Sequence, residues 1–506
     1  MSLKPKAAIP PNTLEFENNA VMKPTGFREY DARWWFGRPG DDKAPEINLY
    51  GIQHLGASLG TLIHELGVEP KIVVGHDYRG YSLSIKQALT VGLMSAGVEV
   101  LDIGLALSPT AYFAQFALDV PCVAMVTASH NTNGWTGVKM GVEKPLTFGP
   151  KEMSRLKEIA LSGNAKSRGG GGYQKIDDMA GLYMRDLAKG IKLKRKIKVV
   201  AACGNGTAGA FAPHVLDKIG VDVIPVQCDL DHNFPHYNPN PEDMKMLHAM
   251  RDAVLEHGAD LAVGFDGDGD RCGIVDNEGE EIFADKVGVM LARDLSAQYE
   301  NAQFVADVKS TGLYLTDPVL KANGAKTDYW KTGHSYIKRR SKEIGALVGF
   351  EKSGHYFFND PIGRGYDDGI LSAIAILQML DRNPDKSMAD LRRALPKTWG
   401  SPTMSPYCSD EEKYGVVDKI IAEYQELQKT GGTILGQNIA ELITVNGVRV
   451  VLEDGTWGLV RASSNTPNLI VVVESPTSED NKIGMFREIE ARLAKYKEIG
   501  EYDQKI

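Results

Sequence analysis

The sequence predicts a multidomain α/β protein that ends in an α+β domain. Its 506 residues exceed one hydrophobic core of ordinary size, and domains of about 100–200 residues give three or four units. Short β-branched segments end in polar or Gly-rich loops and are followed by helical stretches, as in α/β domains. Near the C-terminus, Asn446-Gly447 and Asp454-Gly455 separate alternating segments in the manner of hairpin turns.

The individual elements follow from residue type and length. Apolar segments of five or six residues are too short for helices, so we predict strands at 71–75, 123–127, 197–202, 261–265, 303–308 and 346–350. Helices are expected between them, for example over 284–298 and 367–380. The Gly-rich run Ser167–Gly172 predicts a flexible linker or an exposed loop, which places a first domain boundary near residue 175.

Composition limits the partners of the protein. Lys and Arg number 57 against 66 Asp and Glu, and the net charge of −9 argues against a general affinity for nucleic acid or for a membrane surface. No apolar run approaches the ~20 residues that span a bilayer, and the start lacks the apolar centre of a signal peptide, so a cytoplasmic protein is expected. The five scattered cysteines lack CxxC spacing and predict buried thiols instead of disulfides or a zinc site.

The segment DGDGDR follows one of the predicted strands. In an extended loop, alternate side chains face the same side, so the carboxylates of Asp266, Asp268 and Asp270 can converge on magnesium or calcium. A calcium-binding EF-hand loop does not fit, because Arg271 stands where Gly is needed and Asn277 where Glu is needed. An acidic turn solvated by water is the alternative, whereas Arg271 points towards a phosphate ligand.

Two further loops also follow predicted strands. Thr127–Asn131, TASHN, puts Ser129 where α/β sheets bind ligands, so Ser129 is a candidate nucleophile; local capping of a turn is the alternative. Arg461–Pro467, RASSNTP, joins a cation to hydroxyl and amide side chains that can wrap a dianionic phosphate, unless it is a Ser-rich surface turn.

Three segments carry weaker signals. Glu351–His355, EKSGH, offers an acceptor, a hydroxyl and an imidazole suited to polyhydroxyl recognition, or is a solvated strand end; Thr332–Ser335 is similarly ambiguous. Gly204–Gly209 matches GxGxxG, but neither Asp222 nor Asp229 stands convincingly where a dinucleotide site needs its acid. A tight strand-to-helix turn is therefore the favoured interpretation of this segment.

Together, TASHN, DGDGDR, EKSGH and RASSNTP occur in the order found in the α-D-phosphohexomutase superfamily, and the chain resembles its bacterial phosphomannomutase/phosphoglucomutase branch. The resemblance implies four domains around a central cleft. Three would be similar α/β domains and the fourth a smaller, more mobile α+β domain, each contributing one loop. We expect the domains at 1–177, 178–300, 301–400 and 401–506.

The resemblance also implies roles for single residues. Ser129 would be the phosphorylated serine, and Asp266, Asp268 and Asp270 would hold Mg²⁺ together with a phosphoserine oxygen. The cations Arg33, Lys139 and Arg271 would neutralise the transferring phosphoryl group. His355 is our candidate for proton transfer, with Lys139 and His130 as alternatives. The residues implied in substrate binding are Tyr30, Lys309, Thr332, Gly333, His334, Glu351, Ser353, His355, Arg461, Ser463, Ser464, Asn465 and Thr466.

The implied activity is that of an isomerase of carbohydrate metabolism, which interconverts hexose 1-phosphate and hexose 6-phosphate of mannose or glucose. Hexose 1,6-bisphosphate would be the intermediate and the activator, and the protein would be a monomer or a weak homo-oligomer. A metal-dependent sugar-phosphate phosphatase would use the same acids but would not need a separate phosphate clamp at Arg461. A nucleotide-binding oxidoreductase would rest on Gly204–Gly209 alone.

Overall fold

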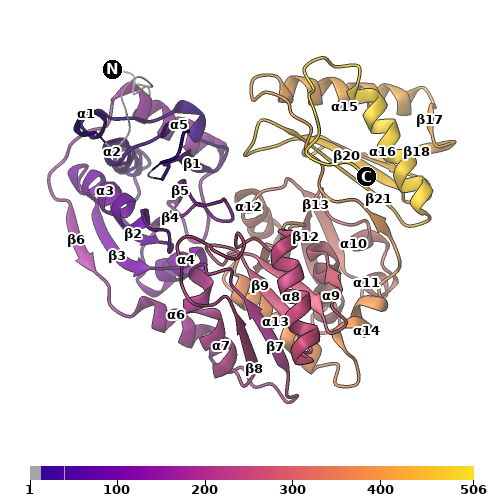
Figure 1. Cartoon of the computed structure of the whole chain (residues 1–506). Coiled ribbons are helices and arrows are strands. Elements are labelled where there is room, and N and C mark those ends of the chain that lie inside the picture. Colours follow the sequence, from indigo (N-terminus) through magenta and orange to yellow (C-terminus); the bar gives the residue numbers. More distant parts are fainter. Residues whose placement is uncertain (1–12, 39) are drawn as a thin grey trace. The chain divides into compact units, whose positions relative to one another are not determined.

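A computed structural model describes residues 13–38 and 40–506 (Figure 1). Its chain divides into two compact units. Unit 1 comprises Met1–Ala284 and Ser353–Ala389, and unit 2 comprises Asp285–Lys352 and Asp390–Ile506. Each unit therefore combines segments that are distant in the sequence.

The first sheet of unit 1 has six strands in the order β1-β5-β4-β2-β3-β6. Its strands are β1 (Asp31–Trp35), β2 (Lys71–His76), β3 (Glu99–Leu105), β4 (Cys122–Val126), β5 (Trp135–Gly141) and β6 (Gly172–Lys175). β2, β3, β4 and β6 run parallel, whereas β5 and β1 pair antiparallel at one edge. The helices of this region are α1 (Leu14–Glu17), η1 (Pro24–Gly26), α2 (Leu49–Glu65), α3 (Ser82–Ser95), α4 (Ser108–Ala117), α5 (Pro150–Ser162) and α6 (Met179–Ala188).

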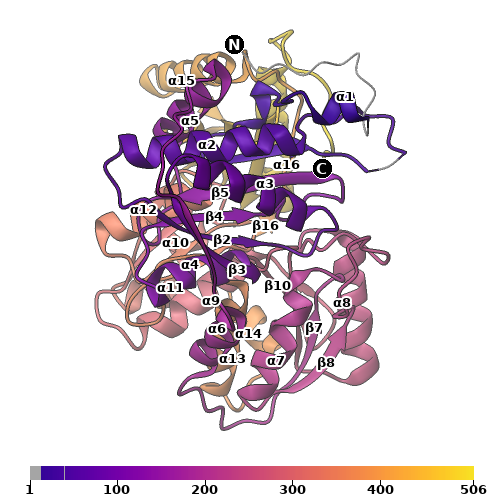
Figure 2. The ribbon, with the colours of Figure 1, turned by 90° about the vertical axis from the view of Figure 1, so that its left-hand side faces the viewer.

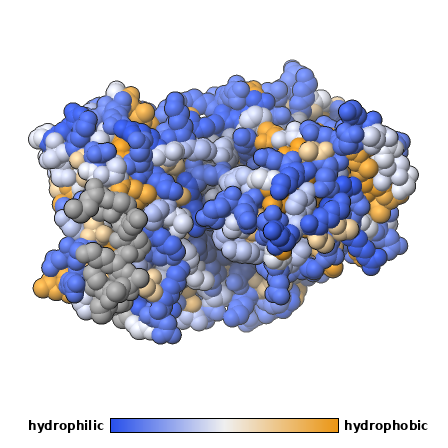
Figure 3. Space-filling view, turned by 90° about the horizontal axis from the view of Figure 1, so that it is seen from above, coloured by the Kyte–Doolittle hydropathy of each residue, from blue (hydrophilic) through white to orange (hydrophobic). Residues whose placement is uncertain are grey.

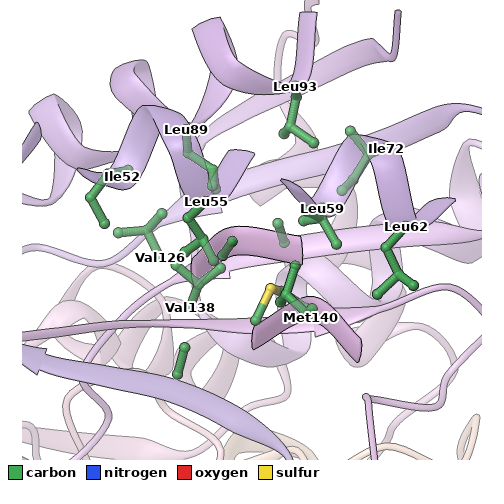
Figure 4. Packing of buried hydrophobic residues seen from close by; sticks show 14 of the residues in the cluster. Ile52, Leu55, Leu59, Leu62, Ile72, Leu89, Leu93, Val126, Val138 and Met140 are labelled. Atoms are coloured by element: carbon green, nitrogen blue, oxygen red, sulfur yellow. The ribbon is translucent and has the colours of Figure 1, made fainter. Parts of the chain in front are cut away.

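Helices α2, α3 and α5 cover one face of this sheet (Figure 2). Ile52, Leu55, Leu59 and Leu62 recur every three or four residues along α2, so they form a single apolar stripe, and all are buried. Gly92 of α3 lets the two helices approach closely, because a Cβ there would lie 2.0 Å from the carbonyl oxygen of Gln53. Figure 4 shows the stripe packed with Ile72, Leu89, Leu93, Val126, Val138 and Met140.

A second sheet of unit 1 has the order β11-β10-β9-β7-β8. Its strands are β7 (Lys198–Ala202), β8 (Asp222–Val226), β9 (Leu261–Phe265), β10 (Cys272–Asp276) and β11 (Glu281–Ile282). β7, β8 and β9 are parallel and β10 turns back antiparallel, so the loop between β9 and β10 is a tight reversal. The remaining elements of unit 1 are η2 (Thr207–Ala210), α7 (Ala212–Lys218), α8 (Met244–His257), β15 (Tyr356–Phe358) and α13 (Gly369–Asp381).

Unit 2 contains a parallel and an antiparallel sheet. The parallel strands are β12 (Gln303–Asp307), β13 (Lys326–Trp330) and β14 (Val348–Phe350), with α9 (Ala284–Ser296), α10 (Leu313–Thr316), α11 (Pro318–Ala322) and α12 (His334–Ile344). The second sheet, in the order β16-β21-β20-β19-β18-β17, contains β16 (Trp399–Gly400), β17 (Thr433–Ile434), β18 (Gln437–Ile443), β19 (Val448–Leu452), β20 (Trp457–Ala462) and β21 (Leu469–Ser475). Helices α15 (Lys413–Lys429) and α16 (Glu479–Leu493) contribute to its core, and α14 (Met388–Arg393) runs across the unit boundary.

Glu474 of β21 joins the two segments of unit 2. Its carboxylate accepts hydrogen bonds from Lys286 Nζ at 2.7 Å, Thr311 Oγ1 at 2.9 Å and the Gly312 amide at 2.8 Å. Thr398 and Trp457 donate two more. Burial raises the pKa of this carboxyl, but Lys286 outweighs burial, and the pKa is lowered to about 2. Glu474 is therefore a fully satisfied buried anion.

The predicted strands and helices are present within a few residues of their expected ends, and Asn446-Gly447 and Asp454-Gly455 form the expected hairpins between β18, β19 and β20. The Gly-rich run is exposed, yet the residues after it form β6 and still belong to the first sheet. The domain boundaries at 177, 300 and 400 stay predictions.

Two further expectations concern membranes and thiols. Within the described residues, no helix combines the length and apolarity that crossing a membrane requires. All five cysteines are free thiols, and four are buried as expected. The prediction of a buried thiol is wrong for Cys228, which follows the edge strand β8 and is only partly buried. On the face drawn in Figure 3, apolar side chains are scattered among polar ones.

The ion pair between Glu474 and Lys286 predicts a pH-dependent contribution to the free energy of unfolding. The folded pKa lies below the ordinary value, so the contribution is present above about pH 4.5 and is lost as the pH falls from there through 2. The shift corresponds to about 3 kcal/mol. We expect Glu474→Gln to lower the thermal midpoint at pH 7, and the deficit to shrink as the pH falls towards 3. Glu426→Gln, on an exposed side chain, is the control. Equal midpoints of wild type and Glu474→Gln at pH 7 would contradict the assignment.

Candidate active site

The loop between β9 and β10 gathers three carboxylates. Asp266, Asp268 and Asp270 have no exposed surface, and one oxygen of each lies within 4.8 Å of the others. The loop is a tight turn instead of the expected extended segment: the Gly269 amide donates to the Asp266 carbonyl at 3.2 Å, and Gly269 has a φ of 71°. The carboxylates thus converge because the chain reverses, not because alternate side chains share a face.

Lys139 of β5 compensates part of this negative charge. Its Nζ lies 2.7 Å from Asp268 Oδ2 and also pairs with Asp270 Oδ2. Burial by itself lowers the pKa of Lys139, but Asp268 and Asp270 raise that pKa well above its usual value. Burial, followed by the charges of Asp268 and Asp270, raises the pKa of Asp266 well above its usual value. Lys139 therefore keeps its proton, whereas the ion pair of Asp266 is a longer one, with Arg271 Nε at 3.9 Å from Asp266 Oδ2.

The acidic loop also fits a divalent cation. Among the described residues, Asp268 Oδ1 and Asp270 Oδ1 are buried and accept no hydrogen bond. Buried carboxylate oxygens without a donor are costly unless a cation completes them. Hard oxygen ligands favour magnesium or calcium. The donor set is therefore compatible with the expected magnesium.

Ser108 is a residue of this site that the sequence analysis missed. It is the first residue of α4, and its Oγ donates to Asp268 Oδ2 at 2.5 Å. Its amide also donates to the Asp268 carbonyl at 3.0 Å. The only local signal was a Ser-Pro pair after a strand, which predicts the start of a helix but not a long-range partner.

Ser129 lies in the loop after β4 and faces the acidic loop. It is 2% exposed, and its Oγ donates to Asp266 Oδ2 at 3.0 Å and lies 3.3 Å from His130 Nδ1. The alternative role for Ser129 was to cap the local turn through a side-chain hydrogen bond. Thr127 makes such a bond instead, because its Oγ1 accepts from the Ser129 amide at 2.9 Å. The serine hydroxyl is thus left to contact a carboxylate from another loop.

Two arginines and two histidines complete the cluster of unit 1. Arg33 Nη1 donates to Asn131 Oδ1 at 2.7 Å, and Arg271 Nε donates to His355 Nε2 at 3.0 Å. Burial, followed by the charges of Arg271 and Arg33, lowers the pKa of His130 well below its usual value. Burial also acts to lower the pKa of His355, but nearby acids, Asp270 foremost, raise it overall. The pKa of His355 is therefore shifted upwards and that of His130 downwards.

His355 has a partner that the sequence did not indicate. Its Nδ1 lies 3.0 Å from Asp367 Oδ2, on the segment that leads into α13. Asp367 has no exposed surface. Asp367 thus contacts the imidazole at Nδ1, while Arg271 contacts it at Nε2.

In unit 2, Asp307 organises a second group of the predicted residues. Its Oδ2 accepts from Thr332 Oγ1 at 2.9 Å and lies 4.0 Å from Lys309 Nζ. Glu351 is 3% exposed, and its Oε1 accepts from the Gly333 amide at 3.1 Å. A buried carboxylate beside buried hydroxyls is suited to binding sugar hydroxyls. Its burial argues against the alternative interpretation, in which this segment is a solvated strand end.

The RASSNTP segment differs from the expected loop at its start. Arg461 belongs to β20, and the loop begins after Ala462. Arg461 is 5% exposed, and within the described part of the chain its Nε has no hydrogen-bond acceptor. Lys413, which the sequence analysis missed, holds the loop by donating to the carbonyls of Ser463 at 2.5 Å and Thr466 at 3.0 Å. Two cations therefore meet at this loop.

The structure thus assembles the predicted residues in two groups. Unit 1 holds Tyr30, Arg33, Ser129, His130, Lys139, Asp266, Asp268, Asp270, Arg271, Ser353 and His355. Unit 2 holds Lys309, Thr332, Gly333, His334, Glu351, Arg461, Ser463, Ser464, Asn465 and Thr466. Within unit 2, the Thr332 amide donates to Asn446 Oδ1 at 3.3 Å, which links the residues predicted to bind sugar to the hairpin beside Arg461.

The GxGxxG segment forms a tight turn. It leads into η2, and a Cβ at Gly209 would lie 2.0 Å from the Cys228 carbonyl oxygen. The Thr207 amide donates to the Gly267 carbonyl at 3.4 Å. These backbone contacts fit the favoured interpretation of a strand-to-helix turn that supports the acidic loop.

Comparisons with known proteins agree with this architecture. The chain matches three family descriptions of phosphoglucomutase/phosphomannomutase: alpha/beta/alpha domain I over residues 25–166, domain II over 182–279 and domain III over 283–399. It is 33% identical over 463 residues to the phosphomannomutase/phosphoglucomutase of Pseudomonas putida, covering 91% of this chain and 94% of that protein. The chain belongs to the phosphoglucomutase/phosphomannomutase family. The predicted resemblance to the α-D-phosphohexomutases is confirmed, and so is the fold class of three α/β domains and a sheet-rich C-terminal domain.

Other relatives lead to the same family. The phosphoglucomutase of Neisseria meningitidis is 30% identical, with 89% of this chain and 93% of that protein covered. The crystal structure of a phosphoglucomutase/phosphomannomutase family protein from Burkholderia thailandensis superimposes with a TM-score of 0.80 at 27% identity, covering 94% of this chain and 98% of that chain. The match therefore extends along nearly the whole chain.

The acidic loop predicts a measurable metal affinity. Asp268→Asn keeps the size of the side chain but removes one of the converging charges, so magnesium should bind at least about tenfold more weakly. Isothermal titration of the chelated protein with MgCl₂ measures this without an activity assay. Asp276→Asn, at another fully buried acid of the same sheet, is the control and should bind magnesium as the wild type does. Unchanged affinity of Asp268→Asn would refute the site.

Proposed function

We propose that the protein is a hexose-phosphate mutase, an isomerase that interconverts the 1- and 6-phosphates of glucose and mannose. The observation that carries the proposal is the buried Ser129, whose hydroxyl contacts Asp266 of a loop suited to a cation. The names of the relatives, phosphomannomutase/phosphoglucomutase and phosphoglucomutase, support the same reaction.

The reaction needs two phosphoryl transfers. In the first, the P–Oγ bond of phosphorylated Ser129 breaks while a sugar hydroxyl forms a new P–O bond and loses its proton to a base, which gives a hexose 1,6-bisphosphate. The intermediate then presents its other end. In the second, the P–O bond at this other end breaks, the P–Oγ bond of Ser129 forms again, and the sugar oxygen released there takes up a proton. Free bisphosphate would activate unphosphorylated enzyme by the second transfer.

The main requirement of these transfers is that positive groups stabilise the negative charge on the transferring phosphoryl oxygens. Lys139, held between Asp268 and Asp270, stays protonated, and Arg33 and Arg271 lie in the same buried cluster. We propose that these cations stabilise the charge on the transferring oxygens. Asp266, Asp268 and Asp270 would hold Mg²⁺, which supplies Lewis-acid stabilisation of a phosphoryl oxygen when bound.

We retain His355 as the group that exchanges the proton. Arg271 Nε donates to His355 Nε2 and Asp367 Oδ2 lies 3.0 Å from Nδ1, so the ring is fixed with an Nε2 lone pair that can take up a proton. The nearby acids that raise its pKa favour the protonated ring once the proton is transferred. Lys139 is poorly suited to act as a base, because its pKa is raised well above the usual value. His130 stays an alternative, since its lowered pKa keeps a neutral ring 3.3 Å from Ser129 Oγ.

Other predicted residues would bind the parts of the substrate that do not react. Arg461, with an unpaired buried Nε, and the hydroxyl-rich loop behind it suit a phosphate that is not transferred. A phosphatase would not need a second phosphate site, so binding of phosphate at Arg461 would favour a mutase. Glu351 and Ser353 are proposed to bind hydroxyl groups of the sugar, and Tyr30, Lys309 and His334 stay predicted substrate contacts.

Several expectations stay predictions. They are the cytoplasmic location, the monomer or weak homo-oligomer, the absence of nucleic-acid and membrane partners and the activation by bisphosphate.

Ser129 provides the direct test of the mechanism. Ser129→Ala removes the phosphoryl carrier, so we expect turnover of glucose 1-phosphate to fall at least about a thousandfold. Ser58→Ala, at a buried serine of α2, is the matched control and should keep wild-type activity. Activity of Ser129→Ala within tenfold of wild type would exclude Ser129 as the carrier.

Sugar specificity tests the recognition residues. Because the substrate must bind in two orientations, recognition can use only hydroxyls that survive the reversal, and the 3- and 4-hydroxyls near its axis do so. Glucose and mannose share these groups and differ at C2, whereas galactose inverts C4. We expect similar kcat/KM for glucose 1-phosphate and mannose 1-phosphate, and a value lower by about tenfold or more for galactose 1-phosphate, equivalent to about 1–3 kcal/mol. Strong discrimination at C2, or indifference at C4, would contradict the proposed role of Glu351 and Ser353.

A further inference from the structure

The loop that carries Ser129 has an unfavourable backbone conformation. Ser129 has a φ of 51°, in the left-handed region that residues with a side chain seldom adopt. Such a conformation persists only where surrounding contacts enforce it, and it is typical of functional sites. The contacts that enforce it here are made from the loop after β2.

Arg79 holds the carbonyl side of the loop. Its Nη2 donates to the Ser129 carbonyl at 2.8 Å and to the Asn131 carbonyl at 2.7 Å. The guanidinium pairs with Asp77, and the two side chains are 1% and 0% exposed. A single buried guanidinium therefore binds the backbone on both sides of His130.

Asp77 holds the amide side of the same loop. Its Oδ2 accepts from Thr127 Oγ1 at 2.8 Å, and Thr127 Oγ1 in turn accepts from the Ser129 amide at 2.9 Å. Ser82 of α3 donates to Asp77 Oδ1 at 2.5 Å, which anchors the carboxylate to the helix. Both backbone polar groups of Ser129 are thus connected to one buried ion pair.

The acidic loop reinforces this arrangement. A Cβ at Gly267 would lie 2.6 Å from the Ser129 carbonyl oxygen and 3.6 Å from Arg79 Nη2, so only glycine allows the two loops to approach this closely. Because the carbonyl of Ser129 is fixed against Arg79 and Gly267, its Oγ is directed to Asp266.

We propose that the buried Asp77–Arg79 pair is a positioning device that sets the orientation of the Ser129 hydroxyl for phosphoryl transfer. This inference rests on the proposed function, and it assigns neither residue a contact with substrate. A misplacement of about 1 Å between reacting groups can cost about a hundredfold in rate. Loss of the pair should therefore lower kcat far more than it changes KM.

The test compares three variants by steady-state kinetics with glucose 1-phosphate. Arg79→Ala removes the guanidinium. Arg79→Lys keeps a cation for Asp77 but lacks the planar guanidinium that contacts two carbonyls. Lys86→Ala removes another buried ion pair of the same sheet region, between Lys86 and Asp102 at 2.6 Å, and is the matched control for destabilisation. We expect kcat of Arg79→Ala to fall by about a hundredfold and that of Arg79→Lys by at least tenfold, with KM changed less than threefold, and Lys86→Ala to keep wild-type kcat.

Chemical rescue separates positioning from general damage. Guanidinium ion at millimolar concentration should raise the kcat of Arg79→Ala at least tenfold, but should not raise the kcat of Ser129→Ala. NaCl at the same ionic strength should restore nothing. If Arg79→Ala does not fold, Arg79→Lys decides the question, and a kcat within threefold of wild type in that variant overturns the proposal.

Phosphoryl labelling distinguishes this inference from the function on which it rests. Glucose 1,6-bisphosphate carrying labelled phosphorus should transfer label to Ser129 of the wild type rapidly and to Ser129 of Arg79→Lys at least tenfold more slowly, as measured by phosphosite mapping. Equal labelling rates would overturn the positioning role alone. Absence of label on wild-type Ser129 would refute the proposed function and the positioning role together.

Discussion

The main physical constraint on unit 1 is the burial of three carboxylates that have no exposed surface, Asp266, Asp268 and Asp270. Buried charge is tolerated only when opposite charge and hydrogen bonds compensate it. Lys139 supplies a cation from β5, Ser108 supplies a donor from α4, and Ser129 supplies another from the loop after β4. The ends of several secondary-structure elements are thereby held at one place, and among the residues that the structure describes, no group donates a hydrogen bond to Asp268 Oδ1 or Asp270 Oδ1.

Unit 2 uses the same principle with fewer charges. Asp307 is a buried acceptor for Ser310 Oγ, Thr332 Oγ1 and the Lys352 amide, and it fixes the ends of neighbouring parallel strands. Neither Asp307 nor Glu474 needs to contact a ligand to be important. Each fixes the positions of the groups that donate hydrogen bonds to it.

The sequence predicts the parts of this protein that depend on local chemistry. Short β-branched segments mark the strands, and TASHN, DGDGDR, EKSGH and RASSNTP mark the loops after them. The prediction fails where geometry depends on distant partners: Ser108 contacts Asp268 across 160 positions, and no local pattern announces such a pair. Arg79 likewise carries no local signal, because the carbonyl of Ser129 that it binds lies fifty positions away.

Two local predictions failed for physical reasons. DGDGDR was expected to be extended, but Gly269 at positive φ permits a tight turn, and a reversal brings carboxylates together more effectively than a pleat. Arg461 was expected in a loop, but its pairing with Ile470 continues β20 through Ala462, so the cation is presented by a rigid strand. In both cases backbone hydrogen bonding, which residue types do not specify, determined the position of the side chain.

The Glu474 network has a consequence for dissecting the protein. Residues 390–506 contain a complete antiparallel sheet with two helices and resemble an autonomous module in the sequence. Yet Lys286, Thr311 and the Gly312 amide, three of the donors to Glu474, belong to residues 285–352. An excised C-terminal fragment would retain a buried anion without its lysine, the most unfavourable half of an ion pair to keep. Truncations, and chimaeras assembled from relatives, therefore need to carry both segments together.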